Sequence, residues 1–282
     1  MAFFNIFNKK KETAPENKLG LVLSGGGIRA LAHAGLLQAL EERGIQPDCI
    51  AGTSGGALIA ALYASGYKPK EMMNFFKDTP VFSFSLFALN KPGLVDSEKY
   101  QVLFEKFFTK TTFEELNIPI TVTATNLNTG KLEFFDSGDL IKPLLASCAL
   151  PPYFSPVKIN DHLYSDGGLL NNFPYEPLCD TCQYTLGSFV NPVAEVENKD
   201  INNTFKLLQR VITISMDANY YHQFNECHYV FLPPEIYTVG ILDVKMLDRA
   251  FEIGYEHAIK EMPTILKILG EETELLEKAK QP

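Results

Sequence analysis

The chain has 282 residues, of which 46% are hydrophobic and 21% are charged. This apolar fraction is large enough to fill a core and excludes an intrinsically disordered protein. Lys and Arg number 25 and Asp and Glu number 34, which gives a formal net charge of −9. Such an acidic balance argues against a nucleic-acid partner bound by phosphate neutralisation, and against broad electrostatic attraction to anionic lipid.

The first 18 residues are expected to form a flexible tail. Within them, Phe3–Lys11 places large apolar residues before three lysines, so contact with a bilayer interface stays open beside a plain tail. The order of charge and apolar residues does not fit a secretory signal peptide. No stretch of about 18 consecutive apolar residues occurs, which excludes a transmembrane helix.

Two strand–loop–helix units open the folded part of the chain. Leu19–Leu23 and Cys49–Gly52 are short apolar runs and are expected to be buried strands. An amphipathic helix over Ile28–Leu40 follows the first, and an alanine-rich helix over Ala57–Ser65 follows the second. This βαβα order predicts a mainly parallel sheet covered by helices.

The next hundred residues mix helices and strands. The segment Lys68–Phe108 is expected to be mainly helical and is interrupted by the aromatic stretch Val81–Leu89, for which a lipid-facing lid and core packing both stay open. Alternation predicts strands over Ile118–Asn126 and Lys131–Phe135. Core positions rather than a lipid channel are expected for four neighbouring apolar residues: Met72, Met73, Phe75 and Phe76.

The remaining elements are shorter patterns, except the last. They are a helix over Ile141–Cys148, a hairpin over Val157–Tyr164, a helix over Asn203–Asn219, a strand over Tyr229–Leu232 and a helix from Val244 to about Leu269, with a bend at Pro263 open. No internal repeat and no long linker interrupts them. A single domain over residues 19–282 is therefore expected.

Gly52-Thr53-Ser54-Gly55-Gly56 fits the pattern G-x-S-x-G between a predicted strand and helix. Small neighbours such as Gly52 and Gly56 permit the sharp turn that lifts a serine hydroxyl out of the backbone. The helix that follows Ser54 directs free N–H groups toward a developing oxyanion. In this context the motif predicts a nucleophilic serine.

Gly25-Gly26-Gly27 follows the first strand and lets several backbone N–H groups point the same way, as an oxyanion hole requires. A dinucleotide fingerprint is the alternative, since Gly25, Gly27 and Ala30 satisfy its spacing. That motif requires an acidic residue at the end of the second strand, whereas Asp48 precedes the second strand. The spacing therefore favours the oxyanion loop.

A serine nucleophile needs a base, and the histidines are poor candidates. His33 and His257 lie in predicted helices, His162 in a hairpin, and His222 and His228 beside a polar turn. Asp166-Gly167-Gly168 instead places a carboxylate at a strand end, ionised at neutral pH at its reference pKa of about 3.9. Asp166 is therefore the expected base.

These three motifs together resemble the patatin-like phospholipase family. Supporting segments are Ser147–Val157 and Asn171–Pro174, so the resemblance covers about residues 19–178. It implies a three-layer α/β/α fold with a mainly parallel central sheet, and a Ser-Asp dyad without histidine. It also implies a lipid acyl hydrolase in which Ser54 is the nucleophile and Asp166 the general base.

The resemblance carries further expectations. The oxyanion hole would use Gly25, Gly26 and Gly27, with Gly55 after the nucleophile. Arg29 is expected to hold the loop or to bind a phosphate head group, with a structural role favoured. An acyltransferase with the same dyad and a catalytically silent lipid-binding protein stay open as alternatives. No cofactor and no metal are expected.

The five cysteines are scattered at positions 49, 148, 179, 182 and 227, which fits structural thiols in a reducing cytoplasm. A zinc site of Cys179, Cys182, Cys227 and His228 is a weaker alternative, because no second closely spaced ligand pair exists. The expected location is cytoplasmic, with peripheral membrane contact open. The expected partner is a lipid or ester substrate.

Overall fold

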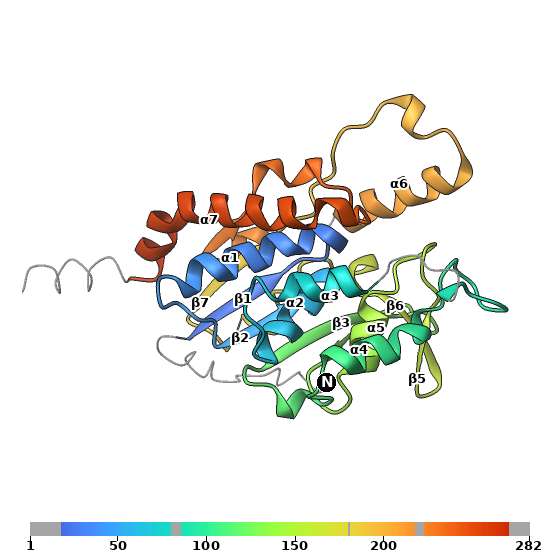
Figure 1. Cartoon of the computed structure of the whole chain (residues 1–282), viewed down its shortest axis with the longest axis horizontal. Coiled ribbons are helices and arrows are strands. Elements are labelled where there is room, and N and C mark those ends of the chain that lie inside the picture. The colour runs from blue at the N-terminus through green and yellow to red at the C-terminus, as the bar shows by residue number, and fades with distance from the viewer. Residues whose placement is uncertain (1–17, 80–85, 180, 218–222, 271–282) are drawn as a thin grey trace, which may run out of the picture.

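A computed structural model describes residues 18–79, 86–179, 181–217 and 223–270, and the structural statements below concern these residues (Figure 1). The strands are β1 Leu19–Leu23, β2 Cys49–Gly52, β3 Ile120–Asn126, β4 Lys131–Phe135, β5 Val157–Ile159, β6 His162–Asp166, β7 Tyr184–Ser188 and β8 Tyr229–Phe231. They form one sheet in the order β5–β6–β3–β2–β1–β7–β8, with β4 also paired to β3.

The centre of the sheet is parallel. β1 pairs in parallel with both β2 and β7, and the parallel pairing continues to β3 on one side and β8 on the other. β4 and β6 pair with β3 in the antiparallel sense, and β5 completes a hairpin with β6. The prediction of an α/β fold with a mainly parallel central sheet and flanking helices is confirmed.

The helices are α1 Leu31–Glu41, α2 Gly55–Ala64, α3 Met72–Asp78, α4 Gln101–Phe107, α5 Ile141–Ser147, α6 Thr204–Asp217 and α7 Leu247–Ile268. α1 and α7 lie against each other along one side of the molecule (Figure 1). Their backbones approach closely because Gly35 and Gly254 lie at the crossing, where a Cβ at either position would overlap the backbone of the opposite helix. Within the described residues, no helix combines the length and apolar character needed to cross a bilayer.

The two faces of the sheet are covered differently. Leu21 and Leu23 of β1 are fully buried in the large core that includes α1, α2 and α7. Val22, between them, points to the opposite face and packs in a smaller cluster with Phe173 and Leu178. This alternation is the period-2 pattern of a strand buried on both sides. The second face is covered mainly by irregular chain rather than by a long helix.

The sequence patterns predict most of these elements, with three differences. β7 was not predicted, although it lies beside β1 in the centre of the sheet. The prediction that Lys68–Phe108 is mainly helical is wrong for residues 88–96, which form turns and bends between α3 and α4. β6 continues to Asp166, two residues beyond the predicted hairpin. The predicted tail 1–18 lies almost entirely outside the described residues, as does most of Val81–Leu89.

Candidate active site

Ser54 lies in the turn between β2 and α2. Its backbone angles, φ 53° and ψ −126°, lie in a region that non-glycine residues rarely adopt. The turn is fixed because the Ser54 N–H donates to Ser147 Oγ at 2.8 Å and the Ser54 carbonyl accepts from the Leu58 N–H at 3.1 Å. A Cβ at Gly56 would overlap the end of β1. The local structure is thus a strained strand-to-helix turn with the geometry of a nucleophile elbow.

Asp166 is the last residue of β6 and caps a short 3₁₀ turn, Gly167–Leu169. Its Oδ1 accepts the Gly168 N–H at 2.8 Å, and the residue is fully buried. Its Oδ2 is buried and has no partner of ordinary hydrogen-bond geometry. A Cβ at Gly167 would overlap Thr123, so this glycine lets the turn lie tightly on β3.

The sheet register brings Ser54 and Asp166 to the same height. β4 pairs with one edge of β3 over Val122–Asn126, so on the other edge Gly52 pairs with Val122 and Asp166 pairs with Ala124. Ser54 lies two residues beyond Gly52, just as Ala124 lies two residues beyond Val122, so Ser54 is at about the level of Ala124. β2 runs parallel and β6 antiparallel to β3 along this edge, so the carboxyl ends of the two strands run toward each other and meet. This topology places a hydroxyl and a carboxylate from distant parts of the chain at one edge.

Burial controls the acidity of Asp166. Desolvation raises the pKa of its carboxyl to about 7, and hydrogen bonds from the Gly168 N–H and the Ser54 hydroxyl oppose that shift. The Ser54 hydroxyl is therefore close to this carboxylate, although the Asp166 Oδ2 has no hydrogen bond of ordinary geometry. A carboxyl group with a pKa near 7 can both accept and return a proton at neutral pH.

The glycine loop after β1 differs from expectation at its first residue. The Gly25 N–H donates to Asn172 Oδ1 at 3.1 Å and to the Asn172 carbonyl at 3.3 Å, so it does not point to the site as an oxyanion donor. The N–H groups of Gly26 and Gly27 have no partner among the described residues. A Cβ at Gly55 would lie 2.7 Å from the Gly27 carbonyl oxygen, so the loop and the elbow are in direct contact.

Asn172 and Ser147 have roles that the motifs alone did not assign. Asn172 holds the glycine loop, and a Cβ at Gly168 would lie 2.9 Å from its Oδ1, so it also lies beside the Asp166 turn. Its Nδ2 is buried without a partner among the described residues. Ser147 anchors the elbow through the Ser54 N–H. Both residues lie in the two segments that support the family resemblance, which was the available signal.

His33 is a buried structural residue. Its Nε2 lies 2.9 Å from the Ser24 carbonyl oxygen, which can only accept, so Nε2 carries the proton and Nδ1 accepts from the Ser188 hydroxyl at 2.7 Å. Burial lowers the pKa of His33 to about 4. The imidazole is therefore neutral and fully engaged in connecting β1 and β7.

The other described histidines lie away from Ser54. His228 accepts the Thr185 N–H at 3.0 Å, and the His257 ring packs against Phe231. His162 is exposed beside Asn126. His222 lies outside the described residues. No described histidine therefore contacts the elbow.

Arg29 is nearly buried and does not line the cavity beside Ser54. Its Nε donates to the Val239 carbonyl at 2.6 Å, and its terminal nitrogens donate to Asn191, Pro192 and Tyr237. Burial lowers the pKa of the guanidinium to about 10. These bonds tie the glycine loop to the C-terminal part of the chain, which is the structural role that the sequence favoured.

A cavity of about 1170 Å³, its open mouth included, lies over the elbow. Ser54 and Asp166 line it, and Asp166 is the one carboxylate or cation among its described lining residues. Most of the remaining wall is aromatic or aliphatic, and it includes Phe75 and Phe76, which belong to the buried core as expected and also face the cavity. α6 closes one side with Ile212 and Met216. The cavity fits an apolar chain better than a charged ligand.

Neither alternative site forms in the described residues. The Cys182 Sγ lies 2.7 Å from the Cys49 Sγ, whereas Cys179 is exposed and donates to the Glu176 carbonyl. No group of three or more metal-ligating side chains is arranged there to hold a metal ion. Asp48 accepts the Leu19 N–H at 2.7 Å at the amino end of the sheet, away from the glycine loop.

The comparisons agree with this geometry. A family model described as patatin-like phospholipase matches residues 21–178, which is more than half of the chain. An uncharacterized NTE family protein of Mycobacterium tuberculosis is 32% identical over 204 residues, which cover 69% of this chain and 56% of that protein. A protein named lysophospholipase NTE1 from Cryptococcus neoformans is 31% identical over 170 residues, which cover 57% of this chain and 10% of that protein.

The chain therefore spans little more than half the length of the mycobacterial relative and a tenth of the fungal one. Among solved structures, VipD from Legionella pneumophila is similar with a TM-score of 0.50 and 17% sequence identity, over 89% of this chain and 68% of that chain. This similarity shows a shared fold.

Proposed function

The chain belongs to the patatin-like phospholipase family, and we propose that it is a serine acyl hydrolase that cleaves carboxylic ester bonds of phospholipids or lysophospholipids. One observation carries the proposal. Ser54, in a strained elbow, and the buried carboxylate of Asp166 line the same apolar cavity. The family supports the reaction class, and the apolar wall of the cavity supports a substrate with an acyl chain.

The reaction would proceed by double displacement. Ser54 Oγ attacks the ester carbonyl carbon while Asp166 takes the hydroxyl proton, and the tetrahedral intermediate expels the alcohol, which receives that proton. Water then attacks the acyl-enzyme, Asp166 accepts a proton from it, and the proton returns to Ser54 as the fatty acid leaves. A pKa of about 7 suits a group that must accept and release a proton in each half-reaction.

Negative charge on the carbonyl oxygen would be stabilised by backbone N–H groups. Gly26, Gly27 and Gly55 are the proposed donors, since their N–H groups have no partner among the described residues and the loop contacts the elbow. Gly25 is left out because its N–H is already bonded to Asn172. The remaining wall of the cavity would hold the acyl chain.

The test is turnover and covalent labelling of the wild type and of Ser54→Ala, across short and long acyl chains. Ser215→Ala, an exposed serine of α6, is the matched control. We expect the wild type and the control to release free fatty acid and to react with a fluorophosphonate probe, and Ser54→Ala to do neither.

Two other outcomes identify the alternatives. Labelling with transfer of the acyl group to an added alcohol, rather than to water, would make the protein an acyltransferase. Absence of both labelling and turnover in the wild type would make it a silent lipid-binding protein and would overturn the proposal.

A further inference from the structure

α6 has an apolar outer face. Four large aliphatic side chains, Leu207, Leu208, Val211 and Ile214, are 45 to 50% exposed. At about 100° per residue they fall within one arc of the helix, which they share with Thr204 and Ser215 and with no charged residue. A contiguous apolar patch of this kind on a surface helix marks an interaction site.

The opposite side of the same helix belongs to the active site. Gln209, Ile212, Thr213 and Met216 line the cavity that holds Ser54. α6 is therefore the wall between this cavity and the apolar outer face. A partner bound to the outer face would therefore be separated from the proposed acyl-chain site only by the thickness of α6.

Two of the three charged residues of α6 are basic. Lys206 and Arg210 lie along one flank of the apolar arc. The third charged residue, Asp217, is the last residue of the helix, so the middle of the apolar arc has only basic neighbours in the sequence of α6. An apolar face flanked by basic residues is the pattern of helices that lie in a membrane interface, where Lys and Arg reach the phosphates.

A second apolar element lies next to α6. Phe87, Leu89 and Leu94 are 39%, 77% and 44% exposed on a loop over residues 86–95. Tyr153 connects the two elements, because its carbonyl accepts the Leu94 N–H at 3.0 Å and its ring packs on Phe205 of α6 at 5.2 Å.

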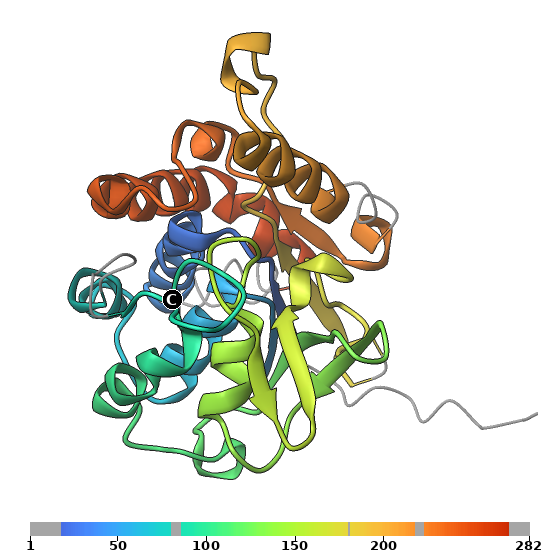
Figure 2. The same ribbon diagram turned by 90° about the vertical axis from the view of Figure 1, so that its right-hand side faces the viewer.

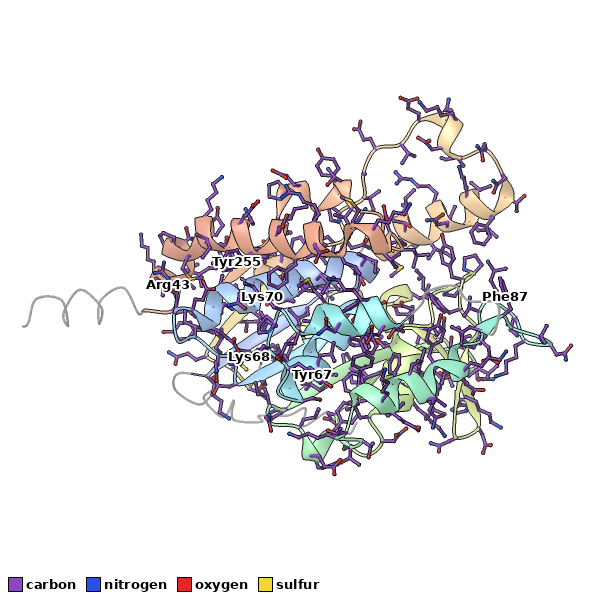
Figure 3. The ribbon with its side chains drawn as sticks, in the orientation of Figure 1. Arg43, Tyr67, Lys68, Lys70, Phe87 and Tyr255 are labelled. Atoms are coloured by element: carbon purple, nitrogen blue, oxygen red, sulfur yellow. The ribbon has the colours of Figure 1, made fainter. Side chains whose placement is uncertain are left out.

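The figures place both elements at the same end of the molecule. Figure 1 shows α6 projecting at the right-hand end, and Phe87 lies at that end in Figure 3. Figure 2 looks directly at this end of the molecule.

We propose that the outer face of α6, together with the loop 86–95, is the surface by which this protein docks on a phospholipid bilayer that contains anionic lipid. The proposal rests on the proposed function for its choice of a lipid surface. A bilayer is favoured over a second copy of this chain because the opposite side of α6 lines the cavity in which the acyl chain is proposed to bind, so lipid on this face lies next to the site that would use it. Docking there would bring the mouth of the cavity to the source of its substrate.

The experiment measures binding of the full chain to sedimented vesicles of phosphatidylcholine, with and without phosphatidylglycerol. Ile214→Asp places a charge in the outer face, and Ile259→Asp is the matched control, since Ile259 is 38% exposed on α7. We expect Ile214→Asp to weaken binding at least about tenfold and Ile259→Asp to leave it unchanged. Lys206→Gln/Arg210→Gln should remove the preference for phosphatidylglycerol. Thermal melting checks that each variant is folded.

Three results would overturn the proposal. These are absence of vesicle binding by the wild type, equal binding by Ile214→Asp, or a wild-type dimer that Ile214→Asp dissociates, which would make the face an interface between copies. Hydrolysis of a soluble short-chain ester is measured in parallel, and Ile214→Asp should retain it. Because Ser54→Ala should bind vesicles like the wild type, failure of the hydrolase proposal would be seen separately from failure of docking.

Discussion

The floor and the wall of the cavity differ in how firmly they are held. The floor consists of the glycine loop, the Ser54 elbow and the Asp166 turn, and its backbone is fixed by bonds to Asn172 and Ser147 and by glycines in contact with neighbouring backbone. The wall is α6, whose outer side chains are about half exposed and whose described contacts with the floor include Met216 packed over Gly168.

The difference follows from what each region must do. Stabilising an oxyanion and transferring a proton require donors within tenths of an ångström, so the floor tolerates few changes. Holding an apolar chain requires only a surface that excludes water, so the wall tolerates many. Substitutions should therefore have large effects in the floor and small effects in the wall.

The largest difference is expected for the base. Asp166→Asn keeps an acceptor for the Gly168 N–H but cannot take the Ser54 proton, so kcat/KM for a short soluble ester should fall roughly 10⁴-fold. Thr213→Val, a change of equal size in the wall, should alter it less than about tenfold. Retention of a tenth of the activity by a folded Asp166→Asn protein would assign the base elsewhere.

The same substitution should stabilise the fold at alkaline pH. The folded pKa of Asp166, about 7, lies above its ordinary value of 3.8, so the folded state binds more protons between these values and stability falls as pH rises through this window. The cost above pH 7 is on the order of 4 kcal/mol. Denaturant unfolding should show Asp166→Asn more stable than the wild type at pH 8 and equal to it near pH 3. A less stable variant at pH 8 would contradict burial of a charge.

In the glycine loop, Gly27→Ala should lower kcat about 10²–10³-fold, because a Cβ there would overlap the Ile241 carbonyl and displace the oxyanion donors. Gly130→Ala is the control. Both glycines have a positive φ, 57° and 67°, but nothing lies within 4 Å of a Cβ at Gly130. Steady-state kinetics of the two variants compare a Cβ that crowds the cavity floor with one that only strains the backbone. An equal fall of kcat in both variants would argue against Gly27 as an oxyanion donor.

The pH profile should report the ionisation of the floor. Since Asp166 acts as a base only when ionised, kcat/KM of the wild type should fall about tenfold for each pH unit below about 7. A soluble ester measured from pH 5 to 9 gives this profile. A midpoint near 4 would show that the carboxylate is solvated rather than buried.

The smallest effects belong to the wall. Ile212→Ala removes a side chain from the cavity, so KM for long-chain esters should rise a few-fold while short-chain esters are unaffected. Ile214→Ala, two residues away on the outer face, should leave both unchanged on soluble substrates. A large loss of kcat in Ile212→Ala would show that α6 also positions the floor.

The accuracy of the sequence predictions depended on whether an element carries a local signal or depends on long-range pairing. β1, β2 and β4 were predicted with their bounds, because apolar runs and alternation are local signals. β7 was missed, since Tyr184–Ser188 is short and contains Gly187, and its place beside β1 depends on pairing with residues 165 positions earlier. The bends of residues 88–96 have a local signal in Asn90-Lys91-Pro92-Gly93, which the prediction of a mainly helical segment passed over.

The sequence alone pointed to Ser54 and Asp166 as the candidate site residues, because a tight turn between strand and helix, or at a strand end, demands glycines at fixed neighbouring positions. The tertiary structure decided how the loops are used. It gave the Gly25 N–H to Asn172, 147 positions away, and left Gly26 and Gly27 as the proposed donors. It also decided that α6 lies over the cavity with a second apolar face outside. Such contacts join residues far apart in the chain, so no local spacing encodes them.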